Sequence, residues 1–255
     1  MRGIVAVFAN MSLAIDESSI LGQGFYGRVY HGALDSECVA AKKALNGASV
    51  TEESRLLELC DHRNVVKYRG LLETGHHNEY FLVMELAQGG TLKDHLGANL
   101  FSFNEKRLLL QQICSGLEHI HSRNILHRDI KAENLLFRDL HRRHVLIADF
   151  GGAEMYQENV RKINTHDVVQ DHEYTFKSDV FLLGLVTYQT FEDLQHVDRL
   201  TLAGRVLRRH RKTPIADPGI YTARIWRTII QSLDWRSERR PTASEFNEAF
   251  ADAAA

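Results

Sequence analysis

Two short groups of polar residues in the middle of the chain carry the side chains best suited to chemistry. The first, His127-Arg128-Asp129, is followed by Asn134, and the second is Asp149-Phe150-Gly151. Asn134 and Asp149 supply hard oxygen ligands of the kind that Mg²⁺ prefers. The two groups therefore predict a magnesium site.

A glycine-rich segment near the N-terminus is suited to phosphate groups. Gly22, Gly24 and Gly27 form a G-x-G-x-x-G pattern between the apolar residues Leu21 and Val29. Glycine lets backbone N–H groups approach phosphate oxygens that a β-carbon would hold away, and the two apolar residues suit the covering of a planar base. Alone the pattern is weak, because a flexible turn also uses glycine. The next segment is strand-like, whereas a dinucleotide-binding fold would continue into a helix.

Four fragments appear in a characteristic order: the glycine loop, Val39-Ala40-Ala41-Lys42, His127 to Asn134, and Asp149 to Gly151. Together they resemble the signature set of the eukaryotic protein kinases, and the resemblance runs from about Ile20 to Phe250. It implies an α+β, bilobal protein-kinase fold, with a small antiparallel β-sheet N-lobe that holds one key helix and a larger α-helical C-lobe. It also implies ATP and Mg²⁺ as cofactors.

The resemblance assigns catalytic roles to individual residues. Lys42 would hold the α- and β-phosphates, and Asp129 would orient the substrate hydroxyl and accept its proton late. Lys131 follows the serine/threonine-kinase pattern, in which it contacts the transferred phosphoryl group, whereas tyrosine kinases carry a different sequence there. Asn134 and Asp149 would bind Mg²⁺. Because phosphoryl transfer passes through a loose transition state, these residues would mainly position groups and neutralise charge.

In the family, a helix glutamate braces the phosphate-binding lysine. Glu53 is the best candidate, nine residues before His62 in a segment that resembles the family's connector after that helix. Glu52 and Glu58 are the alternatives. The connector between Lys42 and Glu53 is short for the family.

Tyr80 to Leu86 resembles the strand that leads into the hinge between the lobes, although an ordinary buried strand has the same pattern. Met84 would then be the gatekeeper, and the backbone from Glu85 to Ala87 would pair with adenine. The full set of nucleotide-binding residues that the resemblance implies is Leu21, Gly22, Gly24, Gly27, Val29, Ala40, Lys42, Met84, Glu85, Ala87 and Leu136.

One segment departs from the family pattern. Asp179 would hold the catalytic loop, from His127 to Asn134, by hydrogen bonds to the backbone of that loop. Arg240 would pair with an acid near the activation segment, which begins at Asp149. Counting back twelve residues from Asp179 gives Asp167, where the family has the glutamate of Ala-Pro-Glu. Arg128 could bind a phosphorylated side chain of this segment. Only Tyr156 and Thr165 offer hydroxyl groups between Gly151 and Asp167 that could carry the phosphate. Peptide docking and regulation by phosphorylation of this short segment are therefore in question.

The elements that must position these residues follow from periodicity. The residue pattern predicts strands over residues 18–44 and an amphipathic helix from Thr51 to Cys60. It predicts further strands over residues 65–72 and 80–86. After Gly89-Gly90 the apolar spacing becomes helical. We expect an N-terminal extension (1–17), an N-lobe (18–86) and a C-lobe (87–255). The apolar start of the extension predicts an extra strand or a loose arm rather than a signal peptide.

Composition sets wider limits. The chain has 255 residues, 44% hydrophobic and 25% charged, as in ordinary globular proteins, and a formal net charge of −2 gives no reason to expect nucleic-acid binding. No apolar run reaches membrane length, and three scattered cysteines suggest reduced thiols. We expect a cytoplasmic protein with no nucleic-acid or membrane partner.

Two further patterns are weaker. His76-His77 and His141-x-x-His144 lack a complete metal-ligand set, which favours solvated turns. Arg205 to Lys212 is a basic run that suits a solvated helix end or an anionic docking surface.

Two functions remain open. The first is an active serine/threonine kinase that transfers the γ-phosphoryl group of ATP to a hydroxyl of a protein substrate, nearest in its motifs to the kinases that head MAP-kinase cascades or to calmodulin-kinase-like ones. The second is a pseudokinase, a nucleotide-binding scaffold or interaction module. The intact Lys42, Asp129, Asn134 and Asp149 favour the first, and the divergent segment after Gly151 favours the second.

Overall fold

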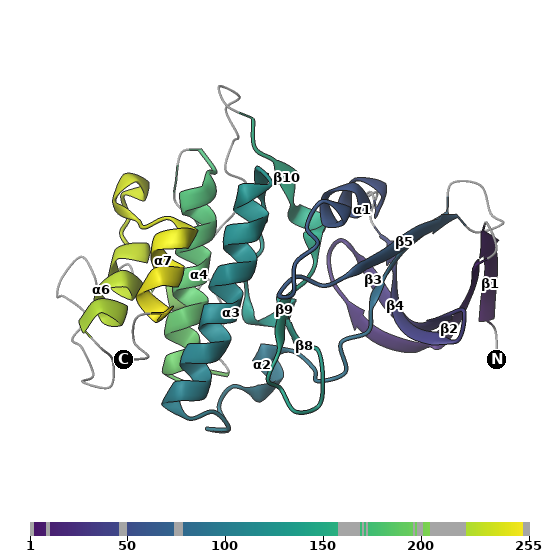
Figure 1. Ribbon diagram of the computed structural model, residues 1–255, viewed down its shortest axis with the longest axis horizontal. Helices are drawn as coiled ribbons and strands as arrows, with labels where there is room; N and C mark the ends of the chain where they lie inside the picture. The colour runs from purple at the N-terminus through teal and green to yellow at the C-terminus, as the bar shows by residue number, and fades with distance from the viewer. Residues whose placement is uncertain are drawn as a thin grey trace.

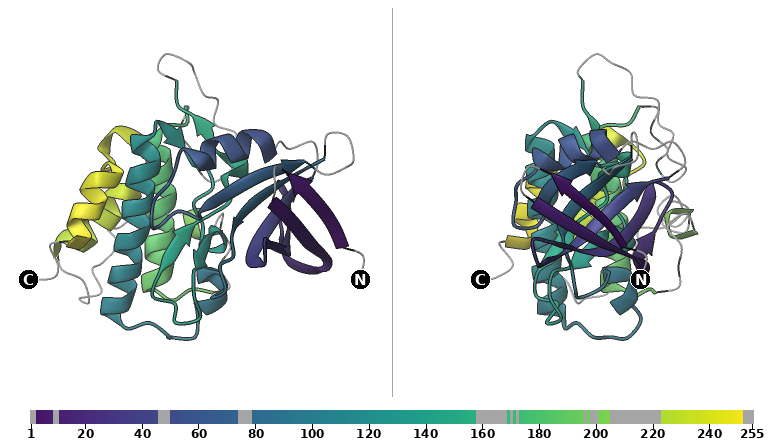
Figure 2. Two further views of the ribbon diagram at one scale, coloured as in Figure 1. Left: turned by 45° about the vertical axis from the view of Figure 1, so that its right-hand side comes forward. Right: turned by 90° about the vertical axis from the view of Figure 1, so that its right-hand side faces the viewer.

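A lobe built mainly of β-strands and a lobe built mainly of helices lie side by side (Figure 1). The computed structural model describes residues 3–8, 11–45, 50–73, 79–157, 169, 171, 173–195, 197, 201–204 and 223–251. The left view in Figure 2 also places the N-terminal strand (purple) and the C-terminal helices (yellow) at opposite ends of the molecule. The predicted bilobal α+β architecture is confirmed.

The small lobe is a six-stranded antiparallel sheet in the order β1-β2-β3-β4-β6-β5. Its strands are β1 (Gly3–Phe8), β2 (Met11–Gln23), β3 (Gly27–Leu34), β4 (Glu37–Ala44), β5 (Tyr68–Glu73) and β6 (Tyr80–Glu85). The first and last strands of this order, β1 and β5, have Cα atoms within 8 Å of each other. The sheet is therefore strongly curled, and its two edges approach one another.

The strand β2 passes through the boundary that the sequence predicted between residues 17 and 18. Leu13 and Ile15, which lie before that boundary, are buried among side chains of the small-lobe sheet such as Val39, Phe81 and Val83. Alternation along the strand explains this, because residues two apart lie on the same face of a sheet. We therefore propose that residues 11–17 belong to the small lobe.

Helix α1 (Val50–Glu58) lies against β5, β6 and the segment after Asp149. It begins one residue before the predicted start and ends two before the predicted end. Val50, Glu53, Leu56 and Leu57 are buried, at the spacing of one helix face. The apolar members of this face belong to the large hydrophobic cluster that continues into the helical lobe. This shared core fixes the helix, and with it Glu53, at the junction between the lobes.

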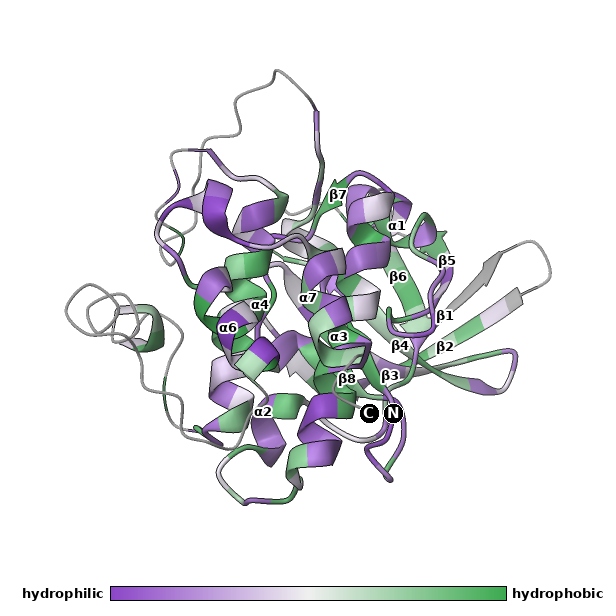
Figure 3. Cartoon of the chain, turned by 60° about the vertical axis from the view of Figure 1, so that its left-hand side comes forward, coloured by the Kyte–Doolittle hydropathy of each residue, from purple (hydrophilic) through white to green (hydrophobic). Residues whose placement is uncertain are grey.

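The large lobe is built around two long helices, α3 and α4, which are packed against each other. Its helices are α2 (Leu92–His95), α3 (Phe103–Ser122), α4 (Phe176–Phe191), α6 (Ala223–Ser232) and α7 (Ala243–Ala251). Ser102 and Glu105 form a capping box that starts α3, with reciprocal side-chain to backbone hydrogen bonds. Polar and apolar residues share the surfaces of α3 and α6 (Figure 3). No helix in the described part of the chain is long and apolar enough to cross a membrane.

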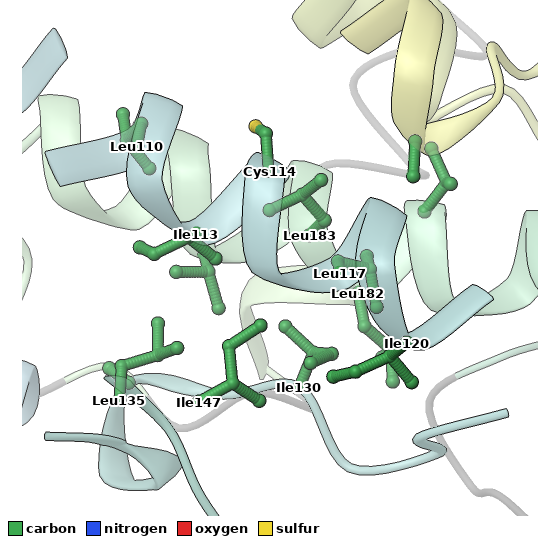
Figure 4. Packing of buried hydrophobic residues seen from close by; sticks show 14 of the residues in the cluster. Leu110, Ile113, Cys114, Leu117, Ile120, Ile130, Leu135, Ile147, Leu182 and Leu183 are labelled. Atoms are coloured by element: carbon green, nitrogen blue, oxygen red, sulfur yellow. The ribbon is translucent and has the colours of Figure 1, made fainter. Parts of the chain in front are cut away.

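The core of the large lobe places α3 between α4 and the short strands that carry the loops of the site. Figure 4 shows Ile113, Leu117 and Ile120 of α3 in the same apolar cluster as Leu182 and Leu183 of α4. Across from them, Ile130, Leu135 and Ile147 of the segments that carry the site's loops belong to the same cluster. Because these side chains are buried and close-packed, the loops they anchor have little freedom to move.

Four short strands frame these loops. β7 (Ile125–Leu126) pairs with β10 (Glu154–Met155), and β8 (Leu135–Phe137) pairs with β9 (Val145–Ile147), both antiparallel. The loop from His127 to Asn134, which ends in the 3₁₀ helix η1 (Ala132–Asn134), connects β7 to β8. The loop from Ala148 to Ala153, which contains the 3₁₀ helix η2 (Phe150–Gly152), connects β9 to β10. The two pairings therefore hold both loops side by side.

Candidate active site

Lys42, Glu53 and Asp149 meet at one point between the lobes. The Lys42 Nζ lies 2.7 Å from Glu53 Oε1 and 2.6 Å from Asp149 Oδ1. Lys42 and Glu53 are each 4% exposed. Neither alternative glutamate is buried here: Glu52 is exposed and bonded to Arg55, and Glu58 is exposed. A strand, a helix and a loop that are distant in sequence thus converge on one ammonium group.

The electrostatics of this group favour a charged lysine. Burial alone would lower the pKa of Lys42, but the carboxylates of Glu53 and Asp149 outweigh it, so the pKa of Lys42 is raised. Removal of one carboxylate would leave a buried charge with less compensation. The lysine is therefore a fixed positive charge at the inner end of the glycine loop.

Asp149 is held in an unusual backbone conformation. Its φ of 64° lies in the left-handed region, which non-glycine residues seldom adopt. The next residue, Phe150, is 1% exposed, and its ring packs edge-on against His127 at 5.0 Å between centroids. The Ala148 N–H donates to the backbone oxygen of Asn134 at 2.9 Å. Burial of Phe150 thus turns the Asp149 carboxylate toward Lys42 and ties its loop to the neighbouring one.

Asp129, Lys131 and Asn134 form a second polar cluster. The Lys131 Nζ lies 2.5 Å from Asp129 Oδ2. The Asn134 Nδ2 donates to the backbone oxygen of Asp129 at 2.8 Å and to its Oδ2 at 3.0 Å. Asp129 is only 7% exposed, so these bonds fix the orientation of its carboxylate.

Asp179 at the start of α4 anchors this loop, as the sequence predicted. Its carboxylate accepts hydrogen bonds from the backbone N–H groups of His127 and Arg128, both at 2.8 Å. It also accepts from the Tyr174 hydroxyl at 2.7 Å and contacts His121 Nε2 at 3.0 Å. Burial disfavours its charge, but the bonds and charge of His121 outweigh burial and lower the pKa of Asp179. An ionised, buried carboxylate therefore holds the loop.

The predicted nucleotide-binding residues come from both lobes. In the sheet, Val29 faces Lys42 across β3 and β4, and Ala40 faces Met84 across β4 and β6. Leu136 lies on β8 of the large lobe.

Other members of the set lie at the rim of the small lobe or in the connection between the lobes. Leu21 is 48% exposed. Glu85 ends β6, its side chain is bonded to Arg138, and Ala87 follows in the connection to the large lobe.

The three glycines of the loop differ in their surroundings. A β-carbon on Gly22 or Gly24 would meet nothing within 4 Å, whereas one on Gly27 would lie 2.6 Å from the backbone oxygen of Lys43. Gly27 is thus required by the packing of the sheet. Gly22 and Gly24 leave open space beside their backbone, as contact with a ligand would require.

A model of the protein kinase domain matches residues 15–248 of the chain. The chain belongs to the protein kinase family. The match begins inside β2, so β1 lies outside it.

Named relatives of this kinase-family chain come from several kingdoms. The serine/threonine-protein kinase pakG of Dictyostelium discoideum is 27% identical over 244 residues, 89% of this chain and 20% of that protein. The calmodulin-binding receptor-like cytoplasmic kinase 3 of Arabidopsis thaliana is 34% identical over 198 residues, 67% of this chain and 38% of that protein. The serine/threonine-protein kinase Nek3 of Mus musculus is 27% identical over 244 residues, 88% of this chain and 47% of that protein. The chain thus spans about a fifth to a half of these relatives' length.

One prediction from the kinase pattern is wrong. The acid that binds Arg240 is Asp171, four residues after the predicted Asp167: Asp171 Oδ2 accepts from Arg240 Nη1 and Oδ1 from Nη2, both at 2.8 Å. The Ser178 hydroxyl also donates to Asp171 Oδ2 at 2.6 Å. Asp171 lies only eight residues before Asp179, so the connection between the acid and α4 is shorter than the family count assumes.

Some sequence predictions fall outside the described residues. These are Asp167, His76, His77 and the basic run from 205 to 212. His141 and His144 are described, and both lie beside Asp139, which accepts from the His141 N–H at 2.8 Å.

Tyr26, at the tip of the glycine loop, is a site residue that the sequence reasoning missed. A β-carbon on Gly151 would lie 2.6 Å from Cβ and Cγ of Tyr26, and one on Gly152 would lie 3.0 Å from its hydroxyl oxygen. The Lys42 Nζ lies 6.0 Å from the centre of the ring. Burial raises the pKa of Tyr26, and the nearby Asp129 and Asp149 raise it further. The ring thus lies between the glycine loop and the residues predicted to bind phosphates and Mg²⁺.

The donor set fits a magnesium ion. Asp149 offers a carboxylate, and Asn134 uses its Nδ2 to bind Asp129, which leaves its Oδ1 as an acceptor. Two protein oxygens, with the remaining positions taken by phosphates and water, are a common arrangement for Mg²⁺. Within the described residues, no three His, Cys, Asp or Glu side chains gather as for a metal held by protein ligands alone.

Proposed function

We propose that this chain is an ATP-dependent serine/threonine protein kinase, which transfers the γ-phosphoryl group of ATP to a hydroxyl of a protein substrate. The observation that carries the proposal is the double contact of Lys42 with Glu53 and Asp149, at 2.7 and 2.6 Å. An assembled lysine–glutamate pair and a correctly placed loop aspartate are both required for phosphoryl transfer in protein kinases. Family membership supports the same assignment.

Each residue of the site has a separate task in this proposal. Lys42, held by Glu53, binds the α- and β-phosphates, and the backbone of the glycine loop covers them. Asp129 accepts a hydrogen bond from the substrate hydroxyl and takes its proton late in the transfer. Lys131, whose Nζ lies 2.5 Å from Asp129 Oδ2, contacts the transferred phosphoryl group and neutralises its charge. Asn134 and Asp149 would hold Mg²⁺, which would offset the negative charge of the phosphates.

The serine/threonine assignment rests on Lys131, whose place two residues after Asp129 resembles the pattern of those kinases. We also propose a cytoplasmic location. The three cysteines, Cys38, Cys60 and Cys114, are all unpaired, which is usual in a reducing compartment. Burial raises the pKa of the Cys60 thiol to about 12, so this cysteine is an inert core residue.

The proposed activity is tested with labelled ATP, Mg²⁺ and generic protein substrates, run beside the Asp129→Asn variant. The wild type should label serine and threonine in the substrate. The variant should transfer phosphate at least about 100-fold more slowly, because general-base catalysis by Asp129 is removed. Equal labelling by the two proteins would refute the assignment.

A pseudokinase is the second candidate. It is favoured by the position of the Tyr26 ring, which packs against Gly151 and lies 6.0 Å from Lys42 Nζ, and by the divergent sequence after Gly151. The two candidates differ in transfer but share nucleotide binding. Thermal stabilisation by ATP with Mg²⁺ that is lost in Asp149→Ala, without substrate labelling, would identify the pseudokinase.

A further inference from the structure

Arg128, directly before the proposed catalytic Asp129, is bound by an acid of its own chain. Its Nη1 donates to Glu154 Oε2 at 2.8 Å, and the two side chains are 20% and 37% exposed. Glu154 lies on β10, where it faces Leu126 of β7. The pair therefore joins the loop before Asp129 to the strand that follows Gly152.

The arginine is also connected to the anchor of the catalytic loop. Its backbone N–H donates to Asp179 Oδ1 at 2.8 Å, with a left-handed φ of 67°. Its guanidinium lies 5.4 Å from the centre of the Tyr174 ring, and the Tyr174 hydroxyl donates to the same Oδ1 at 2.7 Å. Glu154 thus binds the outer end of a residue whose inner end is fixed beside Asp129.

An arginine at this place in a kinase is suited to a phosphorylated side chain, which would order the activation segment. Here a carboxylate of β10 already supplies a negative charge to it. A phosphoryl group that approached Arg128 would meet Glu154 as a like charge and would be disfavoured. The same contact that replaces the phosphate therefore also opposes it.

We infer that Glu154 is a positioning residue, which holds Arg128 and through it Asp129 in place without phosphorylation of the activation segment. The inference rests on the proposed kinase function and specifies how its site is regulated. A partly exposed ion pair is weak by itself, but small displacements of a reacting group reduce transfer steeply. Its effect should therefore appear in the rate of transfer and not in the binding of ATP.

The test uses phosphatase-treated protein, shown by mass spectrometry to carry no phosphate. Wild type, Glu154→Gln and Glu154→Asp are compared with the control Glu37→Gln, which removes another partly exposed ion pair, with Arg69 at 2.6 Å, far from the catalytic loop in sequence. We expect Glu154→Gln to lower kcat about 10-fold with the KM for ATP unchanged. Glu154→Asp should keep most of the activity, and Glu37→Gln should match the wild type.

Two results would overturn the inference. One is a wild type that gains activity only after phosphorylation of its activation segment, and the other is a Glu154→Gln variant as active as the wild type. A raised KM for ATP in Glu154→Gln would also count against it, because the residue would then act on nucleotide binding.

A second measurement does not depend on catalysis. The Tyr156 N–H donates to the backbone oxygen of Asn124 at 2.8 Å, and the Asn124 Nδ2 donates to the backbone oxygen of Tyr156 at 2.7 Å. Hydrogen exchange at Tyr156 should quicken in Glu154→Gln and not in Glu37→Gln. If the wild type transfers no phosphate, the kinase proposal fails, but quicker exchange would still support Glu154 as the residue that holds this segment. Unchanged exchange would refute it.

Discussion

Asp171 binds the guanidinium of Arg240 through both of its carboxylate oxygens, at 2.8 Å each. The Arg240 and Asp171 side chains are 2% and 4% exposed, and Arg240 also lies over the Phe181 ring of α4 at 4.8 Å. The pair is thus a buried connection between the end of the activation segment and the last part of the chain.

We predict that Asp171→Asn destabilises the protein by about 3 kcal/mol, because it leaves a buried guanidinium without its countercharge. Urea unfolding of wild type and variant measures this difference. The control is Asp167→Asn, which should change stability little because Arg240 is bound to Asp171. A larger effect at position 167 than at 171 would contradict the pairing.

Glu53→Gln should lower kcat/KM for phosphoryl transfer by at least about 10-fold, equivalent to about 1.4 kcal/mol. The amide cannot hold the Lys42 ammonium by charge, and the lysine would then turn toward Asp149 alone. Steady-state kinetics with ATP as the varied substrate measure the effect. Glu52→Gln and Glu58→Gln are matched controls on the same helix, both exposed in the structure, and should behave as the wild type.

Tyr26→Ala should tighten the binding of ATP with Mg²⁺ about 5-fold. Its ring, now packed against Gly151, must move aside for the phosphates, and loss of the contact with Lys42 corresponds to about 1 kcal/mol. Calorimetry should show no matching gain for adenosine, which has no phosphates. The control is Phe25→Ala, at a neighbouring side chain that is 75% exposed, which should leave both affinities unchanged. A loss of ATP affinity in Tyr26→Ala would contradict the prediction, because the ring would then support the nucleotide.

Acidification should destabilise the protein as pH falls below about 6.5, the ordinary pKa of histidine. Burial lowers the pKa of His62, His119 and His127 in the folded state. The unfolded chain then binds protons that the folded chain does not, so stability is present above pH 6.5 and is lost as pH falls toward the lowered pKa values. A fully buried histidine such as His127 contributes at most about 1.4 kcal/mol per pH unit.

The His62 and His119 rings are stacked at 4.9 Å between centroids, which allows a specific test. His119→Phe keeps a stacked ring but removes one titrating group, so its urea midpoint should fall less between pH 7.5 and pH 5.5 than that of the wild type. An equal or larger fall would show that this pair does not cause the pH dependence.

The parts of the site that were predictable from sequence are those fixed by short spacings. Asp129, Lys131 and Asn134 lie within six residues, and their mutual bonds follow from one loop. Glu53 was preferred over Glu52 and Glu58 by distance to His62, and it is the glutamate on the buried face of α1. In both cases local geometry leaves few alternatives.

The parts that were missed depend on how distant segments meet. Asp171 was missed because the count from Asp179 assumed a connection of fixed length, and the acid could be identified only from its contact with Arg240. Tyr26 was missed because its sequence predicts an exposed loop tip, while its position is set by Gly151 on another lobe. The Glu154 contact joins residues 26 positions apart, with no spacing rule between them.

The approach of β1 to β5 has a consequence for how copies of the protein meet in solution. Open strand edges present rows of unpaired N–H and C=O groups, which recruit strands from other molecules. Because the curled sheet brings its first and last strands within 8 Å, each shields the other's edge. A chain shortened by residues 3–8 would expose the outer edge of β2 from Met11 to Asp16, and we expect such a chain to self-associate through that edge.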